Sequence, residues 1–143
     1  MSSPSQSKVC FFFDEVSPWL PDRSTLKKFI ESIFKKEGYQ LASLNYIFCT
    51  DKRLLQINRD YLRHDYYTDI ITFGLTQDPI EGEIYISVDR VKDNALQLGV
   101  SFKSELHRVI FHGALHLCGY RDKTKVESNL MRTKEDECLK RYF

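Results

Sequence analysis

The alternation of β-rich and amphipathic helical segments constrains the fold of this chain more than any other feature of its sequence. Short apolar runs rich in β-branched and aromatic residues predict strands at residues 9–13, 44–49, 70–75 and 83–87. Apolar residues at helical spacing predict helices between residues 22 and 38, between 50 and 62, and over 89–98, 101–117 and 125–142. The expected order is therefore β-α-β-α-β-β-α-α-α.

Signals at the segment ends support this order. Residue types that cap helix N-termini stand at three predicted helix starts: Asp22 or Ser24 before the first helix, Thr50 or Asp51 before the second, and Ser101 before the fourth. Asp78-Pro79 and Gly82 mark a turn, which predicts a hairpin with a loop of moderate length between the third and fourth strands. We expect an α+β fold: a mixed sheet of about four strands with one antiparallel edge, packed by about five helices.

The bulk composition predicts one globular domain. The chain has 143 residues, of which 42% are hydrophobic, enough for a single core. We interpret residues 1–7 as a flexible N-terminal tail and residues 8–143 as the domain. Because 21 basic residues nearly balance 20 acidic ones, a nucleic-acid partner would have to be attracted by a local patch rather than by net charge.

The sequence indicates a cytoplasmic protein with no membrane partner. No apolar run approaches the roughly 20 residues of a membrane span. The first residues lack the apolar stretch of a signal peptide. The four cysteines are widely spaced, and we expect reduced, mostly buried thiols: Cys10, Cys49, Cys118 and Cys138. The sequence leaves the oligomeric state open.

Two histidines and an aspartate at defined spacing predict a metal site. His112 and His116 are four residues apart on a predicted helix, so they share one face and can hold one ion. Gly119 can end the helix and turn the chain back, which brings Asp122 toward the same ion. Three protein ligands leave a fourth position for water, as in catalytic zinc sites. We therefore predict one catalytic zinc ion in a small metal-dependent hydrolase.

Other interpretations of these residues stay open. A His-x-x-x-His pair alone is a weak signal, and Asp122 could be a solvated loop acid beside Arg121 and Lys123. The pattern also resembles the metal helix of the zinc proteases, whose general base is a Glu directly after the first His. Gly113 occupies that position here, which disfavours a protease.

The stretch HGALHLCGYRD resembles the signature H-G-x-L-H-L-x-G-Y-D-H of the YbeY family, bacterial endoribonucleases of ribosomal-RNA maturation. Upstream, DYYTDIITF resembles the family's segment ending in T-D-V-L-S-F. Gly82-Glu83-Ile84 resembles its G-D-I, and Glu105-Leu106 stands where the family has a Glu-Leu pair. The likeness covers most of the chain in the family's order.

This resemblance implies an α/β fold around one zinc ion and hydrolysis of single-stranded RNA. It implies a role in maturation of small-subunit ribosomal RNA and in ribosome quality control, with ribosomal RNA and the small ribosomal subunit as partners. Carried over by position, the metal ligands are His112, His116 and Asp122. The alternatives are a metal-dependent protease or other hydrolase, and a non-catalytic ribosome-assembly factor with a structural zinc.

Three positions depart from the family's pattern. The third ligand is usually His, where this chain has Asp122, so the site is one unit less positive. Arg121 stands where the family usually has Asp. The family usually has Arg directly after an upstream aromatic, but here Leu62 follows Tyr61 and Arg63 comes next. The last departure leaves open which arginine contacts RNA.

Three further residues are candidates for catalysis. Arg59 and Arg63 are both placed to stabilise charge on a phosphate. Glu105, two helical turns before His112, could orient a ligand or act as a base, and it could equally be a structural carboxylate paired with Arg108 or His107. The proton acceptor stays unassigned, and either water or the RNA 2′-hydroxyl could attack.

Basic and aromatic residues alternate around the second predicted helix and the segment after it. Such side chains contact phosphates and stack on unpaired bases when proteins bind single-stranded RNA. The alternative is a solvated basic face with the tyrosines in the core. The residues concerned are Lys52, Arg53, Arg59, Tyr61, Arg63, His64, Tyr66 and Tyr67.

Overall fold

The computed structural model describes residues 7–143. Its elements follow the expected order: β1 (Val9–Phe13), α1 (Arg23–Lys36), β2 (Leu41–Cys49), α2 (Asp51–Leu62), β3 (Ile70–Gln77), β4 (Ile80–Ser87), α3 (Val88–Leu98), α4 (Phe102–Leu117) and α5 (Lys125–Tyr142). The tail proposed at residues 1–7 lies outside the described residues except for Ser7, whose hydroxyl donates to Glu31 Oε2 at 2.8 Å. None of the helices within residues 7–143 is long and apolar enough to cross a membrane.

The four strands form one mixed sheet in the order β1-β2-β4-β3. β1 pairs with β2 and β2 with β4 in parallel, while β3 pairs antiparallel with β4 and forms the edge. Only Asp78 and Pro79 separate β3 from β4. The expectation of a loop of moderate length was wrong, because strand pairing continues to Gln77 and Ile80. The fold class, with five helices and one antiparallel edge, is confirmed.

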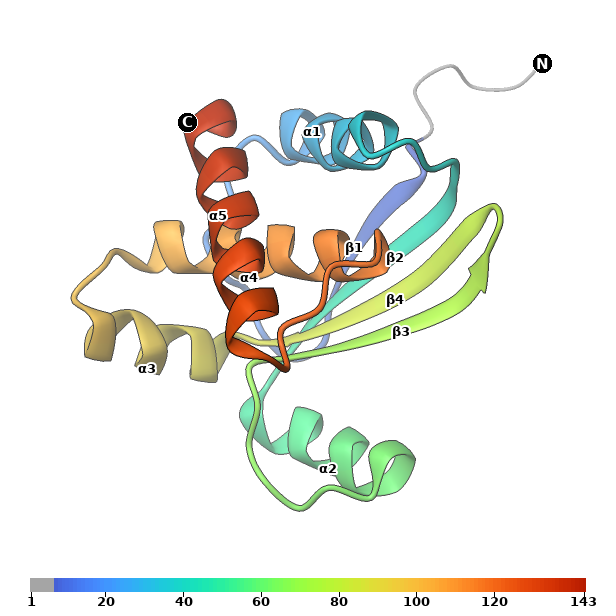
Figure 1. The fold of residues 1–143 in the computed structure, drawn as a ribbon. Coiled ribbons are helices and arrows are strands. Elements are labelled where there is room, and N and C mark those ends of the chain that lie inside the picture. Colours follow the sequence, from blue (N-terminus) through green and yellow to red (C-terminus); the bar gives the residue numbers. More distant parts are fainter. Residues whose placement is uncertain (1–6) are drawn as a thin grey trace.

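Helices cover both faces of the sheet (Figure 1). α1 and α4 pack on one face, and α5 lies on the outside of α4. α2 packs against β3 and β4 on the other face, where Leu54, Ile57 and Ile71 form a small second cluster. The main core lies between the sheet and α1 and α4.

α4 is buried on almost every side, which fits its apolar sequence. Ser101 caps its N-terminus by accepting a hydrogen bond from the Ser104 amide at 3.0 Å, as its residue type predicts. Gly119, at a φ of +100°, follows the end of the helix and reverses the chain. α4 and the segment after it therefore place the predicted metal ligands near the β3 edge of the sheet.

Candidate metal centre

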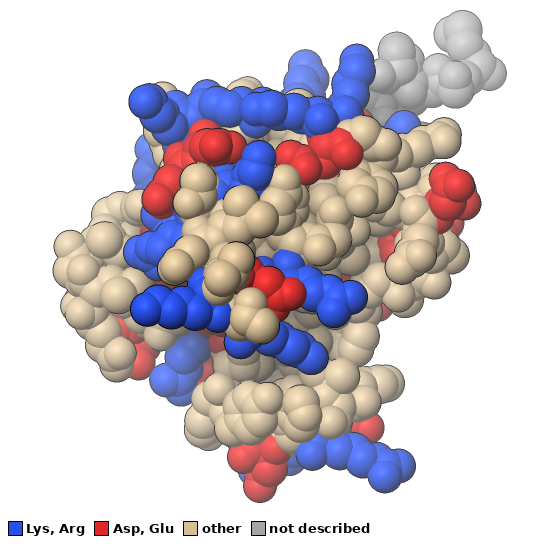
Figure 2. All heavy atoms as spheres, in the orientation of Figure 1, with Lys and Arg blue, Asp and Glu red and all other residues tan. Residues whose placement is uncertain are grey.

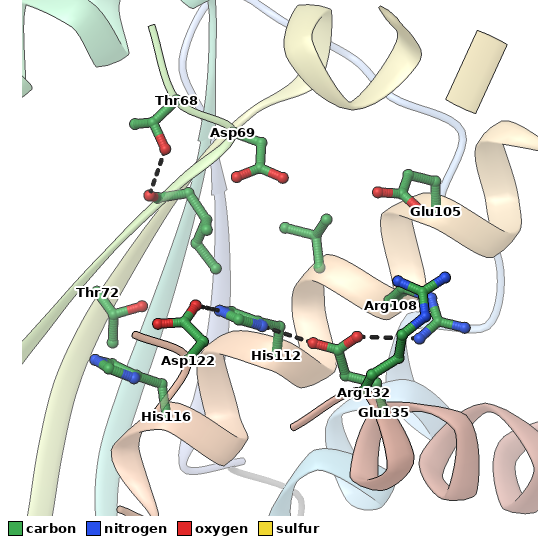
Figure 3. Close-up of a pocket in the computed structure, with 12 residues that line it drawn as sticks. Thr68, Asp69, Thr72, Glu105, Arg108, His112, His116, Asp122, Arg132 and Glu135 are labelled. Atoms are coloured by element: carbon green, nitrogen blue, oxygen red, sulfur yellow. Dashed lines mark hydrogen bonds and ion pairs between the residues drawn. The ribbon is translucent and has the colours of Figure 1, made fainter. Parts of the chain in front are cut away.

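The predicted metal ligands gather in one pocket between α4, α5 and the start of β3 (Figure 3). The pocket has a volume of about 450 Å³. We call it the histidine pocket. Its lining residues are Thr68, Asp69, Ile70, Thr72, Glu105, Arg108, Val109, His112, His116, Asp122, Arg132 and Glu135.

His112 is held in place by a buried carboxylate of α5. Its Nδ1 lies 2.6 Å from Glu135 Oε2, so an Nδ1–H can donate to this oxygen and leave Nε2 free for a ligand. Burial lowers the pKa of His112, but the hydrogen bond to Glu135 and the nearby charges of Glu135, Asp122 and Asp69 outweigh it and raise the pKa overall. A carboxylate behind an imidazole is the usual arrangement around metal-binding histidines.

His116 and Asp122 provide the other two donors. His116 Nδ1 lies 3.0 Å from the Tyr120 carbonyl oxygen, which likewise directs its Nε2 away from the chain. Asp122 Oδ2 lies 3.4 Å from His112 Nε2. Two ligands of one tetrahedral zinc ion stand about 3.3–3.6 Å apart, given bonds of roughly 2.0–2.2 Å. Asp122 therefore lies at ligand spacing from His112 and lines the pocket, with 45% of its side chain exposed.

His112, His116 and Asp122 are of the residue types that bind zinc, but the two imidazoles do not converge on one point. Their rings are parallel, with centroids 6.5 Å apart. Across residues 7–143, no three His, Cys, Asp or Glu side chains converge on one point as metal ligands do. Two neutral imidazoles and one carboxylate are nevertheless a known zinc set, and each histidine already has its second nitrogen engaged. A shared ion would require a change in side-chain orientation, for which His116, the exposed histidine of the two, is the candidate.

Two further carboxylates, Asp69 and Glu105, line the pocket and lie in the upper half of the view in Figure 3. Burial, followed by the charge of Asp69, raises the pKa of Glu105. Burial also raises the pKa of Asp69, against the lowering effect of His112. Within residues 7–143, Glu105 forms no ion pair with Arg108 or any other cation, so the structural pairing considered for it was wrong.

The arginines expected at the site lie elsewhere. Arg59 pairs with Asp65, and Arg63 is the C-cap of α2 in a left-handed conformation with a φ of +56°. Neither lines the histidine pocket. The pocket contains Arg108 and Arg132 instead, which come from α4 and α5.

The tyrosines near α2 are exposed, which contradicts their placement in the core. Exposed fractions are 73% for Tyr61, 56% for Tyr66 and 55% for Tyr67. Tyr66 stacks on His64 with ring centroids 5.1 Å apart. Thr68 and Asp69, which follow Tyr67 directly, line the histidine pocket. These tyrosines are therefore exposed, and the chain passes directly from Tyr67 to residues that line the pocket.

Gly113 packs against the sheet and has no room for a side chain. A Cβ there would lie 2.7 Å from Ile84 Cδ1 and 3.1 Å from Ile70 Cδ1. A glutamate could occupy this position only if the side chains of Ile84 and Ile70 shifted. The geometry therefore agrees with the argument from sequence against a protease.

Comparison with known proteins decides the family. A sequence model described as Endoribonuclease YbeY matches residues 19–143. A curated Endoribonuclease YbeY of Cytophaga hutchinsonii is 52% identical over 137 residues, which cover 94% of this chain and 96% of that protein. The chain belongs to the YbeY family.

Further relatives agree with this assignment. The Endoribonuclease YbeY of Bacteroides thetaiotaomicron is 45% identical over 85% of this chain and 89% of its own length. A Thermotoga maritima protein solved in solution superposes with a TM-score of 0.66 at 27% identity, covering 94% of this chain and 88% of that one. The match covers the whole domain rather than the histidine signature alone.

The sequence did not predict Glu135 and Arg108 as residues of the site. Glu135 and Arg108 meet in an ion pair of 3.0 Å directly behind His112. A signal for Glu135 was present, because Met131, Glu135 and Cys138 share the buried face of α5 and an acid on an apolar stripe needs a partner. Arg108 gave no comparable signal.

Proposed function

We propose that this chain is a zinc-dependent endoribonuclease that cleaves single-stranded RNA. We further propose that it acts in the cytoplasm, in maturation of small-subunit ribosomal RNA and in ribosome quality control. The observation that carries the proposal is the grouping of His112, Asp122 and the buried Glu135 in the histidine pocket, in a chain of the YbeY family.

His112, His116 and Asp122 would hold the ion. When bound, zinc supplies Lewis-acid polarisation of a phosphate oxygen and activation of water. Glu135 orients His112 and favours the tautomer with a free Nε2. The pocket of about 450 Å³ beside these residues leaves room for a phosphodiester group and a water molecule.

Glu105 is our candidate for the proton acceptor. It lines the same pocket, and burial raises its pKa above that of an ordinary glutamate, which makes it a stronger base. Arg59 and Arg63 stay candidates for phosphate contact outside the pocket. Whether water or the 2′-hydroxyl attacks is decided by the products: a cyclic phosphate indicates the 2′-hydroxyl.

The exposed tyrosines support single-stranded RNA as the substrate. Aromatic rings stack on unpaired bases, and this contributes about 1–3 kcal/mol per base. Tyr61, Tyr66 and Tyr67 offer such rings beside the basic side chains of α2, and the chain runs from them into the pocket.

No feature of the site favours the alternatives. A protease of the His-Glu pattern needs a base where Gly113 packs against Ile84. A structural zinc is enclosed by four protein ligands, whereas the three donors here border an open pocket.

Cleavage assays separate these functions. Zinc-loaded wild type and His116→Ala are each incubated with unstructured RNA, the same sequence in duplex form, and casein. We expect the wild type to cleave only the single strand, and His116→Ala to lose the activity while keeping its fold by circular dichroism. Cleavage of casein but not RNA, or equal RNA cleavage by both proteins, contradicts the proposal.

A further inference from the structure

A second hollow joins the histidine pocket at the metal ligands. It lies between the β3–β4 hairpin, residues 38–40 and the segment between α4 and α5, and has a volume of about 910 Å³. We call it the hairpin groove. Thr72, His116 and Asp122 line both hollows, so the two are continuous across the ligand set.

The histidine pocket is acidic for a site that binds RNA. Asp69, Glu105, Asp122 and Glu135 all line it. The charge of Arg108 is engaged, because its guanidinium pairs with Glu135 at 3.0 Å and with Asp136 at 2.6 Å. Cations beside the ligand set would favour the entry of a phosphodiester chain into such a pocket.

Arg132 is the remaining cation of the histidine pocket. It projects from α5 beside Arg108 (Figure 3) and is exposed. Within residues 7–143 it forms no hydrogen bond or ion pair, although its charge lowers the pKa of the nearby Glu105, which burial raises overall. Its guanidinium is therefore available to a phosphate group.

The hairpin groove carries two cations of the same kind. Arg121 and Lys123 line it, both are exposed, and neither pairs with another residue in the described part of the chain. By contrast, Arg53 lies 3.6 Å from Asp14, and Arg90 pairs with Asp51 at 2.7 Å. Figure 2 shows basic side chains gathered over the lower part of α5 and the loop before it, with acidic ones between them.

The groove also offers contacts for bases. Tyr39 has an exposed fraction of 43%, and Gln40 and Gln77 also line the groove. An aromatic ring and amide groups suit unpaired bases, which expose both a face and hydrogen-bonding edges. Asp78 is the one acid of the groove lining besides Asp122.

We infer that single-stranded RNA crosses the ligand set from one hollow to the other. Arg132 binds the backbone on the side of the histidine pocket, and Arg121 and Lys123 bind it on the side of the hairpin groove. The scissile phosphate lies between these contacts, at His112, His116 and Asp122. This inference rests on the proposed function and names the path of its substrate.

Salt-dependent binding tests the path without catalysis. A short fluorescein-labelled unstructured RNA is titrated with metal-free protein in the presence of a chelator, and the association constant is measured by anisotropy over a range of potassium chloride concentrations. Each phosphate contact on a single strand contributes about 0.7 to the slope of log K against log salt. Arg132→Gln and Arg121→Gln should each lower the slope by about 0.7, and the double variant by about 1.4.

Lys140→Gln is the matched control, because Lys140 is an exposed cation of α5 that lines neither hollow. It should leave the slope unchanged. A wild type without salt-dependent binding contradicts the proposed function itself. If the wild type binds with a steep salt slope that none of the variants alters, the path is wrong but the proposed function is not contradicted. If only Arg132→Gln or only Arg121→Gln lowers the slope, RNA contacts one hollow and does not cross the ligand set.

Discussion

The carboxylate behind His112 gives the sharpest prediction about the metal site. Glu135 Oε2 lies 2.6 Å from His112 Nδ1, and its other oxygen accepts from Arg108 at 3.0 Å. Glu135→Gln keeps the shape of the side chain but removes the charge, and one carboxamide cannot accept from both partners as well as a carboxylate does. We expect zinc affinity to fall about 10–100-fold, which is about 1.4–2.7 kcal/mol.

The matched control is Asp136→Asn. Asp136 pairs with the same Arg108 at 2.6 Å, but its side chain is 58% exposed and does not line the histidine pocket. Exposed ion pairs contribute about 0–1 kcal/mol to stability, and this one should contribute nothing to metal affinity. Comparing the two variants therefore distinguishes an effect on the orientation of His112 from an effect of removing a negative charge beside Arg108.

Competition with a chromophoric chelator measures the zinc affinity of wild type and both variants. Urea unfolding of the metal-free proteins shows whether the variants are folded under the same conditions. Equal zinc affinity in wild type and Glu135→Gln would refute the reasoning, and so would an equal loss in Asp136→Asn.

Three further predictions follow from packing, burial and exposure. Gly113→Ala should destabilise the protein by about 1–3 kcal/mol in urea unfolding despite the better helix propensity of Ala, because the new Cβ would lie 2.7 Å from Ile84 Cδ1. The loss of unfolding free energy should be smaller when Ile84→Val is also present. A Gly113→Ala variant that is more stable than the wild type would contradict the prediction. Glu105→Gln should unfold at higher urea than wild type at pH 7, because burial raises the pKa of Glu105 and ionisation then costs folding free energy. The difference should vanish as the pH falls below the ordinary pKa of a glutamate, and a pH-independent difference would argue against burial as the cause. Tyr66→Ala should weaken binding of single-stranded RNA by about 1–3 kcal/mol in the anisotropy assay while duplex binding changes little, and an equal loss for both would exclude stacking.

Local sequence signals were sufficient for most of the fold. Ser101 caps its helix as expected, and of Thr50 and Asp51 it is Thr50 that caps the second helix, since a hydroxyl before an amphipathic run satisfies free amides at a helix start. Asp22 precedes the first helix but makes no side-chain capping hydrogen bond. The strands extend beyond the predicted runs, because pairing of backbone groups continues where the side chains give no apolar signal, as at Gln77 and Ile80.

The candidate site was predictable only where its residues are close in sequence. His112, His116 and Asp122 follow from helix geometry and one glycine turn. Glu135 reaches His112 from another helix, and no spacing rule connects α4 to α5. The arginines show the same limit, because Arg132 enters the histidine pocket by the packing of α5, whereas Arg59 lies outside the pocket and pairs with Asp65.

The central claim is that Asp122 completes a zinc site with His112 and His116. The most direct measurement is anomalous scattering at the zinc edge from crystals of the zinc-loaded protein. We predict one peak in the histidine pocket within bonding distance of Nε2 of both histidines and of one Asp122 oxygen, about 2.0–2.2 Å from each. A peak that these three side chains do not share, or none in the pocket at full zinc loading, would contradict the account.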